Sequence, residues 1–258
     1  MSRLDYAYAV GRVRALEKDL ISRAVFWEAA EEKDFSSALK VIFDAGTFLV
    51  EKIAINDSRE LDSFLTQEKE ALIDLVSDLL LEEEIRLVIG QEDTPHEALE
   101  VAEMTGYDFF CDYFRRKIDL GNLKIFLRAK YSETPKEQFS ELVLKGGYVE
   151  RRRLIDSYEL SFSEIGDILR TTAYQDIWVR AVDTLVEKET FVDLERGIED
   201  HLMRFLHRAK YVVFGPEPVF AYALGRKREL NLVRLLGVGK MNLVPTEILK
   251  ARISETYV

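Results

Sequence analysis

The sequence predicts an all-α protein, and three features of the 258-residue chain support this prediction. Apolar residues recur at three-to-four-residue spacing along most of the chain, the pattern of amphipathic helices. Sustained alternation of apolar and polar residues is absent, and the strand-like run 211–214 is too short to establish a sheet. Thr-Pro pairs at 94–95 and 134–135 precede charged helical patterns, as expected at helix N-termini.

The predicted elements of the N-terminal half follow this spacing. Aromatic residues recur at helical intervals near the N-terminus and are expected in the core: Tyr6, Tyr8, Phe26 and Trp27. Residues 61–81 alternate an apolar stripe with acidic residues, which predicts a helix with one solvated face. A further helix is expected to begin at Pro95, with Thr94 as its N-cap and Glu97 completing a capping box.

The C-terminal half continues the helical pattern. Residues 110–130 and 185–210 each carry an apolar stripe, and Thr134-Pro135 with Glu137 predicts another capped helix start. We expect Gly146-Gly147 to close a helix and residues 215–218 to form a turn that leads into a new one. Val244-Pro245 predicts the start of the last helix.

Composition places the chain among folded globular proteins. Apolar side chains make up 47% of the residues and charged ones 32%, with 13 Gly and 5 Pro, so low-complexity disorder is not expected. The longest uncharged stretch, 218–225, is far shorter than the roughly 20 apolar residues of a membrane-spanning helix. The N-terminus lacks the apolar core of a secretory signal, and Cys111 has no second thiol. We therefore expect a cytoplasmic protein without a transmembrane segment.

The net charge of -11 is concentrated in one segment. Residues 57–103 contain 15 Asp or Glu and 3 Lys or Arg, so the rest of the chain is nearly neutral. A nucleic-acid surface needs Lys and Arg gathered on one face. We do not expect a nucleic-acid partner.

An internal repeat is the most informative feature of the sequence. The segment FCDYFRRKIDLGNLKIFLRAK, which begins at Phe110, aligns without a gap with FAYALGRKRELNLVRLLGVGK, which begins at Phe220. The register matches charge, apolar spacing and the later proline of a helix start, which indicates two copies of one helical unit. A weaker match at residues 8–20 suggests a third. Only about 40 residues follow Phe220, so residues 160–210 or the N-terminal helices must complete the last copy.

Two interpretations of the repeat remain open. Arg116 and Asp119, like Arg226 and Glu229, are three residues apart, so each pair can form an ion pair on its own helix. Alternatively, each copy presents a similar basic helix to a common partner.

The repeat residues also carry a resemblance to a known family. The segments YAYAVGRVRALEKDLIS, IDLGNLKIFLRAK and KGGYVERRRLID are similar to the central-stalk protein of V-type and A-type rotary ATPases, called the C subunit in prokaryotes and the d subunit in eukaryotes. The similarity continues from LERGIEDHLMRFLHRAKYVVFGPEPVFAYALGRK to the ending ARISETYV. It covers most of residues 1–20 and nearly all of 105–258, whereas 45–105 is little similar and shorter than expected.

The resemblance implies a helical funnel, or socket, of three units related by a pseudo-threefold axis. The units would be residues 1–108, which are shortened and acidic, residues 109–218, and a partial third unit at 219–258 completed by neighbouring helices. It also implies a noncatalytic subunit, peripheral to the membrane, that joins the central shaft subunits of the catalytic head to the membrane proteolipid ring for proton or sodium transport.

Reactive groups are few. His201 and His207 are six residues apart, unlike the i and i+4 pair of helical zinc motifs, and His96 is remote in sequence. Cys111 lies in the aromatic run FFCDYF, which favours a small buried side chain over a nucleophile. Lys240 follows two glycines, but the spacing is not that of a phosphate-binding loop. We expect no catalytic residue, no metal site and no cofactor.

The candidate site is therefore a partner-binding surface made of repeat-matched cations and the densest basic run. The candidate residues are Lys124, Arg128, Lys130, Arg151, Arg152, Arg153, Arg234 and Lys240. The alternative is a soluble helical enzyme or ligand-binding module with an acidic cation site in residues 57–103, where Asp74 and Asp78 share a helix face.

Overall fold

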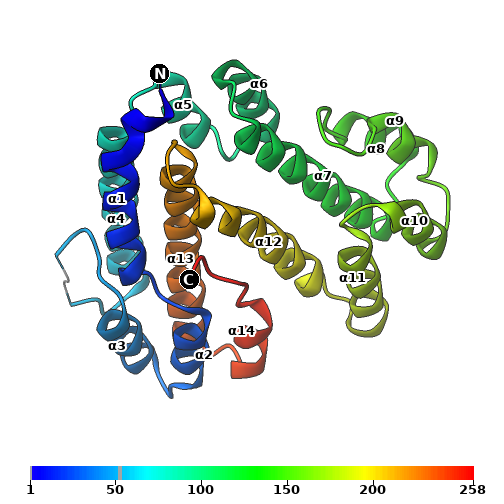
Figure 1. Cartoon of the computed structure of the whole chain (residues 1–258). Helices are drawn as coiled ribbons and strands as arrows, with labels where there is room; N and C mark the ends of the chain where they lie inside the picture. The colour runs from blue at the N-terminus through cyan, green and yellow to red at the C-terminus, as the bar shows by residue number, and fades with distance from the viewer. Residues whose placement is uncertain (1, 52–53) are drawn as a thin grey trace. The chain divides into compact units, whose positions relative to one another are not determined.

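The computed structural model describes residues 2–51 and 54–258, and every regular element in those ranges is a helix (Figure 1). The all-α prediction is confirmed. The chain divides into two compact units: unit 1 contains Met1–Ile89 and Met203–Val258, and unit 2 contains Gly90–Leu202. Each unit is described by itself.

Unit 1 combines the two ends of the chain. Its helices are η1 (Arg3–Tyr6), α1 (Ala7–Leu16), η2 (Glu17–Asp19), α2 (Arg23–Glu31), α3 (Phe35–Ala45), α4 (Ser58–Leu79), α5 (Glu83–Gly90), η4 (His207–Tyr211), α13 (Glu217–Met241) and α14 (Thr246–Arg252). Unit 2 contains α6 (Pro95–Thr105), α7 (Asp108–Tyr131), α8 (Lys136–Leu142), α9 (Arg151–Asp156), α10 (Phe162–Ile168), η3 (Leu169–Thr171) and α11 (Gln175–Lys188). Helix α12 (Val192–Leu206) begins in unit 2 and ends in unit 1.

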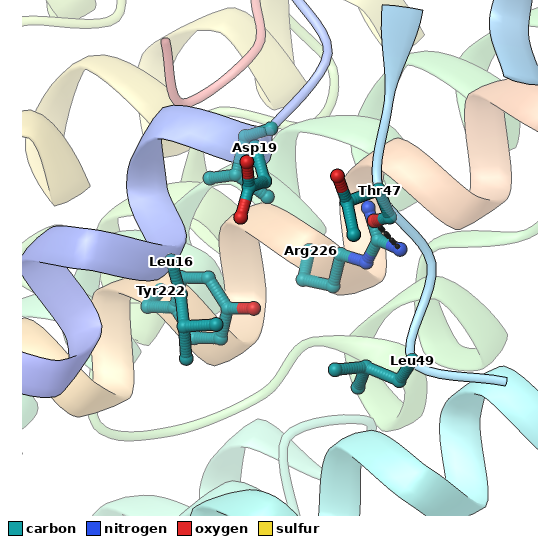
Figure 2. A pocket seen from close by; sticks show the side chains of 7 residues that line it. Leu16, Asp19, Thr47, Leu49, Tyr222 and Arg226 are labelled. Atoms are coloured by element: carbon teal, nitrogen blue, oxygen red, sulfur yellow. Dashed lines mark hydrogen bonds between the residues drawn. The ribbon is translucent and has the colours of Figure 1, made fainter. Parts of the chain in front are cut away.

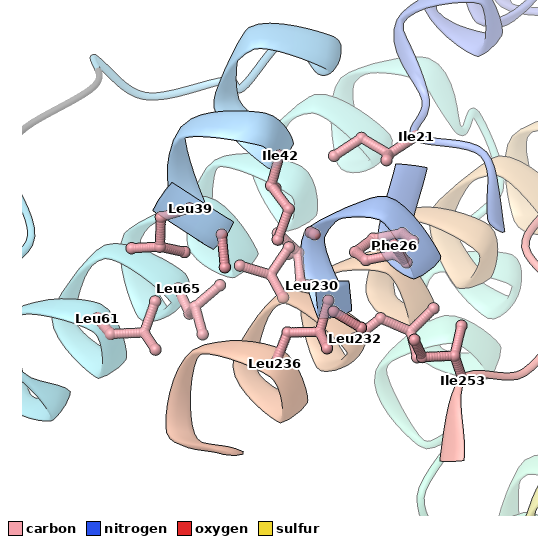
Figure 3. Packing of buried hydrophobic residues seen from close by; sticks show 14 of the residues in the cluster. Ile21, Phe26, Leu39, Ile42, Leu61, Leu65, Leu230, Leu232, Leu236 and Ile253 are labelled. Carbon is pink, nitrogen blue, oxygen red and sulfur yellow. The ribbon is translucent and has the colours of Figure 1, made fainter. Parts of the chain in front are cut away.

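Helix α13 forms the centre of unit 1. Leu230 and Leu236 of this helix pack with Ile42 from α3 and Leu61 from α4 in a buried apolar cluster (Figure 3). Complete burial of one such side chain contributes about 1.5 to 3 kcal/mol. A methyl group at Gly237 would lie 2.5 Å from Leu61 Cδ2, so the glycine permits the close approach of α4 to α13.

Aromatic side chains dominate the core of unit 2. Phe126 of α7 packs edge-on against Phe139, Tyr158 and Trp178, with ring centroids 5.1 to 5.6 Å apart. Phe139 and Tyr158 stack with their centroids 4.2 Å apart. The Trp178 indole N–H donates to the carbonyl of Phe162 at 2.9 Å, so its polar atom is satisfied in the core.

The repeat predicted from residues 110–130 and 220–240 is confirmed as a local structure. Each long helix ends in the same turn, in which a residue with positive φ, Glu133 (51°) or Leu243 (55°), reverses the chain. The amide of Thr134 donates to the carbonyl of Ala129 at 2.9 Å, and its counterpart in unit 1, from Val244 to Gly239, has the same length. Helices α8 and α14 then begin and end at matching positions.

The copy in unit 1 is completed by the N-terminal helices. In unit 2, Arg151 at the start of α9 donates through Nε to the carbonyl of Val143, just after α8, at 2.9 Å. In unit 1, Arg23 at the start of α2 donates through Nη2 to the carbonyl of Ile253, just after α14, at 3.1 Å. Helix α2 therefore occupies in unit 1 the place that α9 occupies in unit 2. In unit 1, this element comes from the N-terminal part of the chain.

Equivalent carboxylates hold these helices at their N-termini. Asp119 of α7 accepts the amide of Val149 at 3.0 Å, two residues before α9 begins. Glu229, which aligns with Asp119, accepts the amide of Ile21 at 3.3 Å, two residues before α2 begins. The repeat thus preserves an interaction between a buried carboxylate and a backbone amide across distant parts of the chain.

The third match, at residues 8–20, does not form an equivalent long helix. Helix α1 ends at Leu16, and a single 3-10 turn follows before α2. Of the four aromatic residues expected in the core, Tyr6 and Phe26 are fully buried, but Tyr8 is 74% exposed and Trp27 43% exposed. The prediction was wrong for Tyr8 and Trp27, because helical spacing alone does not separate the edge of a buried stripe from its centre.

Three local predictions also need correction. The stretch 185–210 is not one helix, since Glu189 adopts a left-handed conformation and ends α11. Neither predicted capping box forms: the Thr94 hydroxyl donates to the carbonyl of Gln91, and Pro135 takes the N-cap position before α8. Gly146 lies in the connection after α8 rather than closing it, with φ of 101°.

Candidate functional site

Three of the eight predicted basic residues are partly or fully buried and bind backbone carbonyls inside their own unit. The Lys130 ammonium donates to the carbonyls of Tyr158 and Leu160 at 2.7 and 2.8 Å. Its repeat counterpart, Lys240, is 9% exposed and donates to the carbonyl of Glu32. In both units, therefore, a lysine near the end of the long helix binds carbonyl groups that follow one of the matching helices, α9 in unit 2 and α2 in unit 1. Arg151 binds the carbonyls of Ser140 and Val143.

The other five basic residues lie at the surface of their units. On α7, Lys124 and Arg128 both contact the Glu195 carboxylate, at 3.5 and 2.7 Å. On α13, Arg234 pairs with Asp62 of α4 at 2.9 Å. Exposed pairs of this kind contribute at most about 1 kcal/mol each and leave the cations accessible to a partner.

Helix α9 carries the two remaining surface arginines. The Arg152 side chain is 90% exposed and lies 3.5 Å from Asp156 on the same helix. Arg153 is also exposed and donates to the carbonyl of Ile168 at 3.1 Å. The run at 151–153 therefore combines one internal cation with two that face solvent.

A buried charge cluster lies at the centre of unit 1. Arg226 is 1% exposed and contacts two carboxylates, Glu229 on its own helix and Glu68 of α4, the latter at 3.1 Å. It also donates to the carbonyl of Thr47 at 2.9 Å and lies over the Phe48 ring at 4.8 Å. Loss of one partner from such a cluster costs about 3 to 5 kcal/mol, because a buried charge is left uncompensated.

Burial raises the pKa of Glu229 to about 7, although the Arg226 guanidinium and the Ile21 amide oppose this rise. One guanidinium serves two buried carboxylates, so a proton on Glu229 relieves their repulsion. For this copy of the repeat, the structure supports the ion-pair interpretation, since Arg226 and Glu229 are both hidden from any partner.

A small cavity of about 20 Å³ adjoins this cluster and is lined by Asp19, Thr47, Leu49, Tyr222 and Arg226, among others (Figure 2). The buried Nε atom of Arg226 has no hydrogen-bond partner within the described chain. The cavity has room for a water molecule and is too small for an organic cofactor.

In unit 2, the residues that match Glu229 and Arg226 are Asp119 and Arg116, and their partners differ from those in unit 1. Asp119 is 1% exposed and accepts the Tyr174 hydroxyl at 2.8 Å in addition to backbone amides. Burial raises the pKa of Asp119, opposed by these hydrogen bonds. Arg116, the counterpart of Arg226, lies 3.3 Å from Nε2 of His201. The two copies thus share a buried carboxylate but differ in its surroundings.

Comparison with known proteins gives the family. Residues 96–252, more than half of the chain, match the family model described as ATP synthase (C/AC39) subunit. The chain belongs to this family. The C/AC39 match runs from α6 to the end of α14, includes the long helices α7 and α13 of the repeat, and confirms the resemblance found in the sequence.

Two curated relatives of this C/AC39 chain agree with the family match. The chain is 25% identical over 161 residues to the C subunit of the V-type sodium ATPase of Enterococcus hirae, a match that covers 62% of the chain and 48% of the relative. It is 26% identical over 149 residues to the C subunit of the A-type ATP synthase of Methanococcoides burtonii, covering 56% and 40%. The matched region spans less than half the length of either relative.

The described residues of the C/AC39 chain offer little reactive chemistry. No group of three His, Cys, Asp or Glu side chains in residues 2–51 and 54–258 is placed to hold a metal ion. Asp74 and Asp78, proposed as part of an acidic cation site, are both exposed on α4. Burial raises the pKa of the Cys111 thiol, which disfavours the nucleophilic thiolate. No helix in the described part of the chain is long and apolar enough to span a membrane.

Sequence reasoning missed one member of the buried cluster. The i, i+3 spacing identified Arg226 and Glu229 as a pair, but Glu68 lies 158 residues from Arg226 in a strongly acidic segment. A signal was available, since Glu68 falls three residues after Leu65 on the apolar stripe of α4, where a carboxylate needs a buried partner.

Proposed function

We propose that this C/AC39 chain is a noncatalytic central-stalk subunit of a V/A-type rotary ATPase. In this role it links the shaft subunits of the catalytic head to the membrane proteolipid ring during proton or sodium transport. The family match over residues 96–252 carries the proposal. The names of the two relatives, both C subunits of an ion-translocating ATPase or ATP synthase, support it.

The mechanism would be mechanical. Torque passes through a coupling protein only if its units deform little, and close-packed helical interiors have low compressibility. In unit 1, α13 is packed on several sides, and its buried cluster ties α4 and the segment at Thr47 to the same guanidinium. In unit 2, Lys130 and Asp119 tie α7 to the segments that flank α9. These interactions would let each unit act as a stiff body.

The partner-binding role falls to the exposed members of the predicted basic set: Lys124, Arg128, Arg152, Arg153 and Arg234. The three inward-facing cations would act indirectly, by stabilising the helices that carry the exposed basic residues. These cations are Lys130 on α7, Lys240 on α13 and Arg151 on α9. The arrangement of three units around a pseudo-threefold axis, with boundaries near residues 108 and 218, belongs to the same proposal. So does a cytoplasmic location at the membrane surface.

Isolation of the tagged chain from its own cell membranes tests the proposal. We expect shaft and proteolipid subunits of a rotary ATPase to co-purify, and the chain freed of them to hydrolyse no nucleotide. A chain recovered alone from solubilised membranes, or steady ATP turnover that persists after removal of head subunits, would refute the coupling role.

A charge-reversal pair tests the partner-binding residues. Arg152→Glu with Arg153→Glu should lower the yield of co-purified subunits, more strongly at low ionic strength, because exposed charges are screened over about 8 Å at physiological salt. Arg180→Glu with Lys188→Glu on α11 is a matched control, since both residues are exposed in the same unit. Equal losses from the two variants would show that net charge, not the α9 surface, matters.

A further inference from the structure

Two connections of unit 1 meet at the buried charge cluster. One comprises residues 20–22, between η2 and α2, and the other comprises residues 46–50, which follow α3. The amide of Thr47 donates to the carbonyl of Asp19, the residue before the first connection, at 3.3 Å. A methyl group at Gly46 would lie 2.6 Å from Ile21 Cδ1, so the two connections also pack closely. We call residues 20–22 and 46–50 the double-loop lid.

Every member of the charge cluster binds the backbone of the double-loop lid. The hydrogen bonds run from the Ile21 amide to Glu229 (3.3 Å), from the Val50 amide to Glu68 (2.7 Å) and from Arg226 to the Thr47 carbonyl (2.9 Å). The side chains of the lid residues Ile21 and Phe48 are 1% and 8% exposed. The lid therefore shields the cluster from water, and its position depends on the charges beneath it.

The cluster contains one cation for two carboxylates. Glu68, Arg226 and Glu229 are 0%, 1% and 2% exposed. With both carboxylates ionised, the cluster carries an excess negative charge in the core, which is unfavourable without solvent. The buried Nε of Arg226 has no hydrogen-bond partner within the described chain, so the closed lid also leaves a donor unsatisfied. A proton on Glu229 removes the excess charge, whereas water solvates it only after the lid opens.

Neighbouring charges do not balance the cluster. The titratable groups around Glu229 are Arg226 and Tyr222 of α13, Glu68 of α4 and Asp19 of η2. Cations on other helices packed against α13 have acidic partners of their own: Arg14 with Glu17 on α1, Arg23 of α2 with Glu255, and Lys250 of α14 with Glu31. Helix α3 contributes apolar side chains to this core. Protonation is therefore the available means of neutralising the closed cluster.

The other copy of the repeat builds the same junction without a second carboxylate. Asp119 accepts the amides of Tyr148 and Val149, both at 3.0 Å, and the hydroxyl of Tyr174 at 2.8 Å. Glu229 instead accepts one lid amide and shares its guanidinium with Glu68. Attachment of the helix that completes each copy thus requires one buried carboxylate. The second carboxylate adds a sensitivity to protons that unit 2 does not share.

We propose that the cluster of Glu68, Arg226 and Glu229 is a proton-sensitive switch: a proton on Glu229 keeps the double-loop lid closed, and its loss lets the lid open to water. The small cavity beside Arg226 supports this role, because residues of both lid connections line it together with Tyr222 (Figure 2). A water molecule that enters there is next to the cluster. The switch is a property of the chain itself and goes beyond the proposed coupling function.

The direction of the pH effect follows from the burial of Glu229. In the closed lid, burial raises the pKa of Glu229 to about 7 from the ordinary value of 4.5, which applies once the lid is open and the carboxylate is hydrated. The proton therefore stabilises the closed lid fully below pH 4.5, and this stabilisation is lost as the pH rises to 7. The equilibrium constant for lid opening should rise up to about tenfold per pH unit in this window and level off above it.

Amide hydrogen exchange of the full chain, resolved by NMR and corrected for intrinsic exchange rates, measures this constant. The Ile21 amide should open at least about tenfold more readily at pH 7 than at pH 5. Val233, a buried residue in the centre of α13, is the internal reference. Its amide should stay at least about tenfold better protected than that of Ile21, because it exchanges only when the helix itself unfolds.

Three variants test which carboxylate holds the proton. Glu229→Gln keeps an acceptor for the Ile21 amide but does not titrate, so lid opening should no longer depend on pH. Glu68→Gln removes the charge that repels an ionised Glu229, so the rise should end at a lower pH. Asp74→Asn is the matched control, since Asp74 is an exposed carboxylate on α4, and its profile should equal that of the native chain.

Several outcomes would overturn the proposal. One is a flat profile at Ile21 in the native chain, and another is the same rise in Glu229→Gln. Equal protection of Ile21 and Val233 at every pH would also refute it, since opening would then be global unfolding. If Glu229→Gln fails to fold, an unchanged profile in Glu68→Gln refutes the shared site. None of these measurements involves another ATPase subunit, so failure of the switch and failure of the coupling function are distinguishable.

Discussion

Gly225 lies in the middle of α13, where Tyr257 of the C-terminal segment packs onto the helix. A methyl group at Gly225 would lie 2.6 Å from Tyr257 Cβ and 2.9 Å from Tyr257 Cγ, well inside van der Waals contact. Tyr257 is 1% exposed, and its Cβ cannot move without the backbone. We therefore predict that Gly225→Ala displaces the C-terminal segment from α13.

The magnitude follows from two opposing effects. Displacement of a fully buried aromatic ring costs about 3 kcal/mol, the lower end of the range for aromatic-to-Ala substitutions in cores. Ala gains about 1 kcal/mol over Gly in a helix interior. Gly225→Ala should therefore lower the free energy of unfolding by about 2 kcal/mol. In a Tyr257→Gly background, which removes both the ring and Cβ, the same change should raise it by about 1 kcal/mol.

Urea unfolding followed by far-UV circular dichroism measures all four members of this double-mutant cycle. Gly11→Ala is the control, because Gly11 lies in α1 of the same unit and no atom lies within 4 Å of the added methyl group. It should stabilise both backgrounds by about 1 kcal/mol. A Gly225→Ala effect with the same sign in both backgrounds would refute the packing argument.

Three further predictions concern buried charges. Lys240→Met should lower the free energy of unfolding by about 1 to 3 kcal/mol, measured by urea unfolding, because it leaves the Glu32 carbonyl after α2 without its donor. As a control, Lys124→Met at the surface of α7 should cost less than about 0.5 kcal/mol. Arg226→Met should cost about 3 to 5 kcal/mol, measured by urea unfolding, and an effect below 1 kcal/mol would contradict the buried cluster. Because the pKa of Glu229 is raised to about 7, the folded state holds a proton that the unfolded state loses near pH 4.5. The native chain should therefore lose roughly 3 kcal/mol relative to Glu229→Gln as the pH rises from 4.5 to 7, and parallel pH profiles would refute this assignment.

Local sequence predicted the elements whose determinants lie close together in the chain. The ungapped match between residues 110–130 and 220–240 predicted two equal long helices, and the matching prolines predicted that a short helix follows each. These features depend on apolar spacing and on the restricted backbone of proline, which act over a few residues. The sequence did not predict that the stretch 185–210 breaks between α11 and α12. The break occurs at Glu189, which adopts a left-handed backbone conformation that glycine usually takes at a helix end.

The sequence by itself determined the helical class, the two-copy repeat and the family resemblance. Only the tertiary structure decided that α2 completes the last copy, that Glu68 joins Arg226, and that Lys130 and Lys240 turn inward. Each of these outcomes depends on groups far apart in the chain, as in the contact from Lys240 to Glu32, 208 residues away. Helical periodicity specifies which face of a helix is apolar, but the partner of a buried charge is selected only when packed helices exclude water around it.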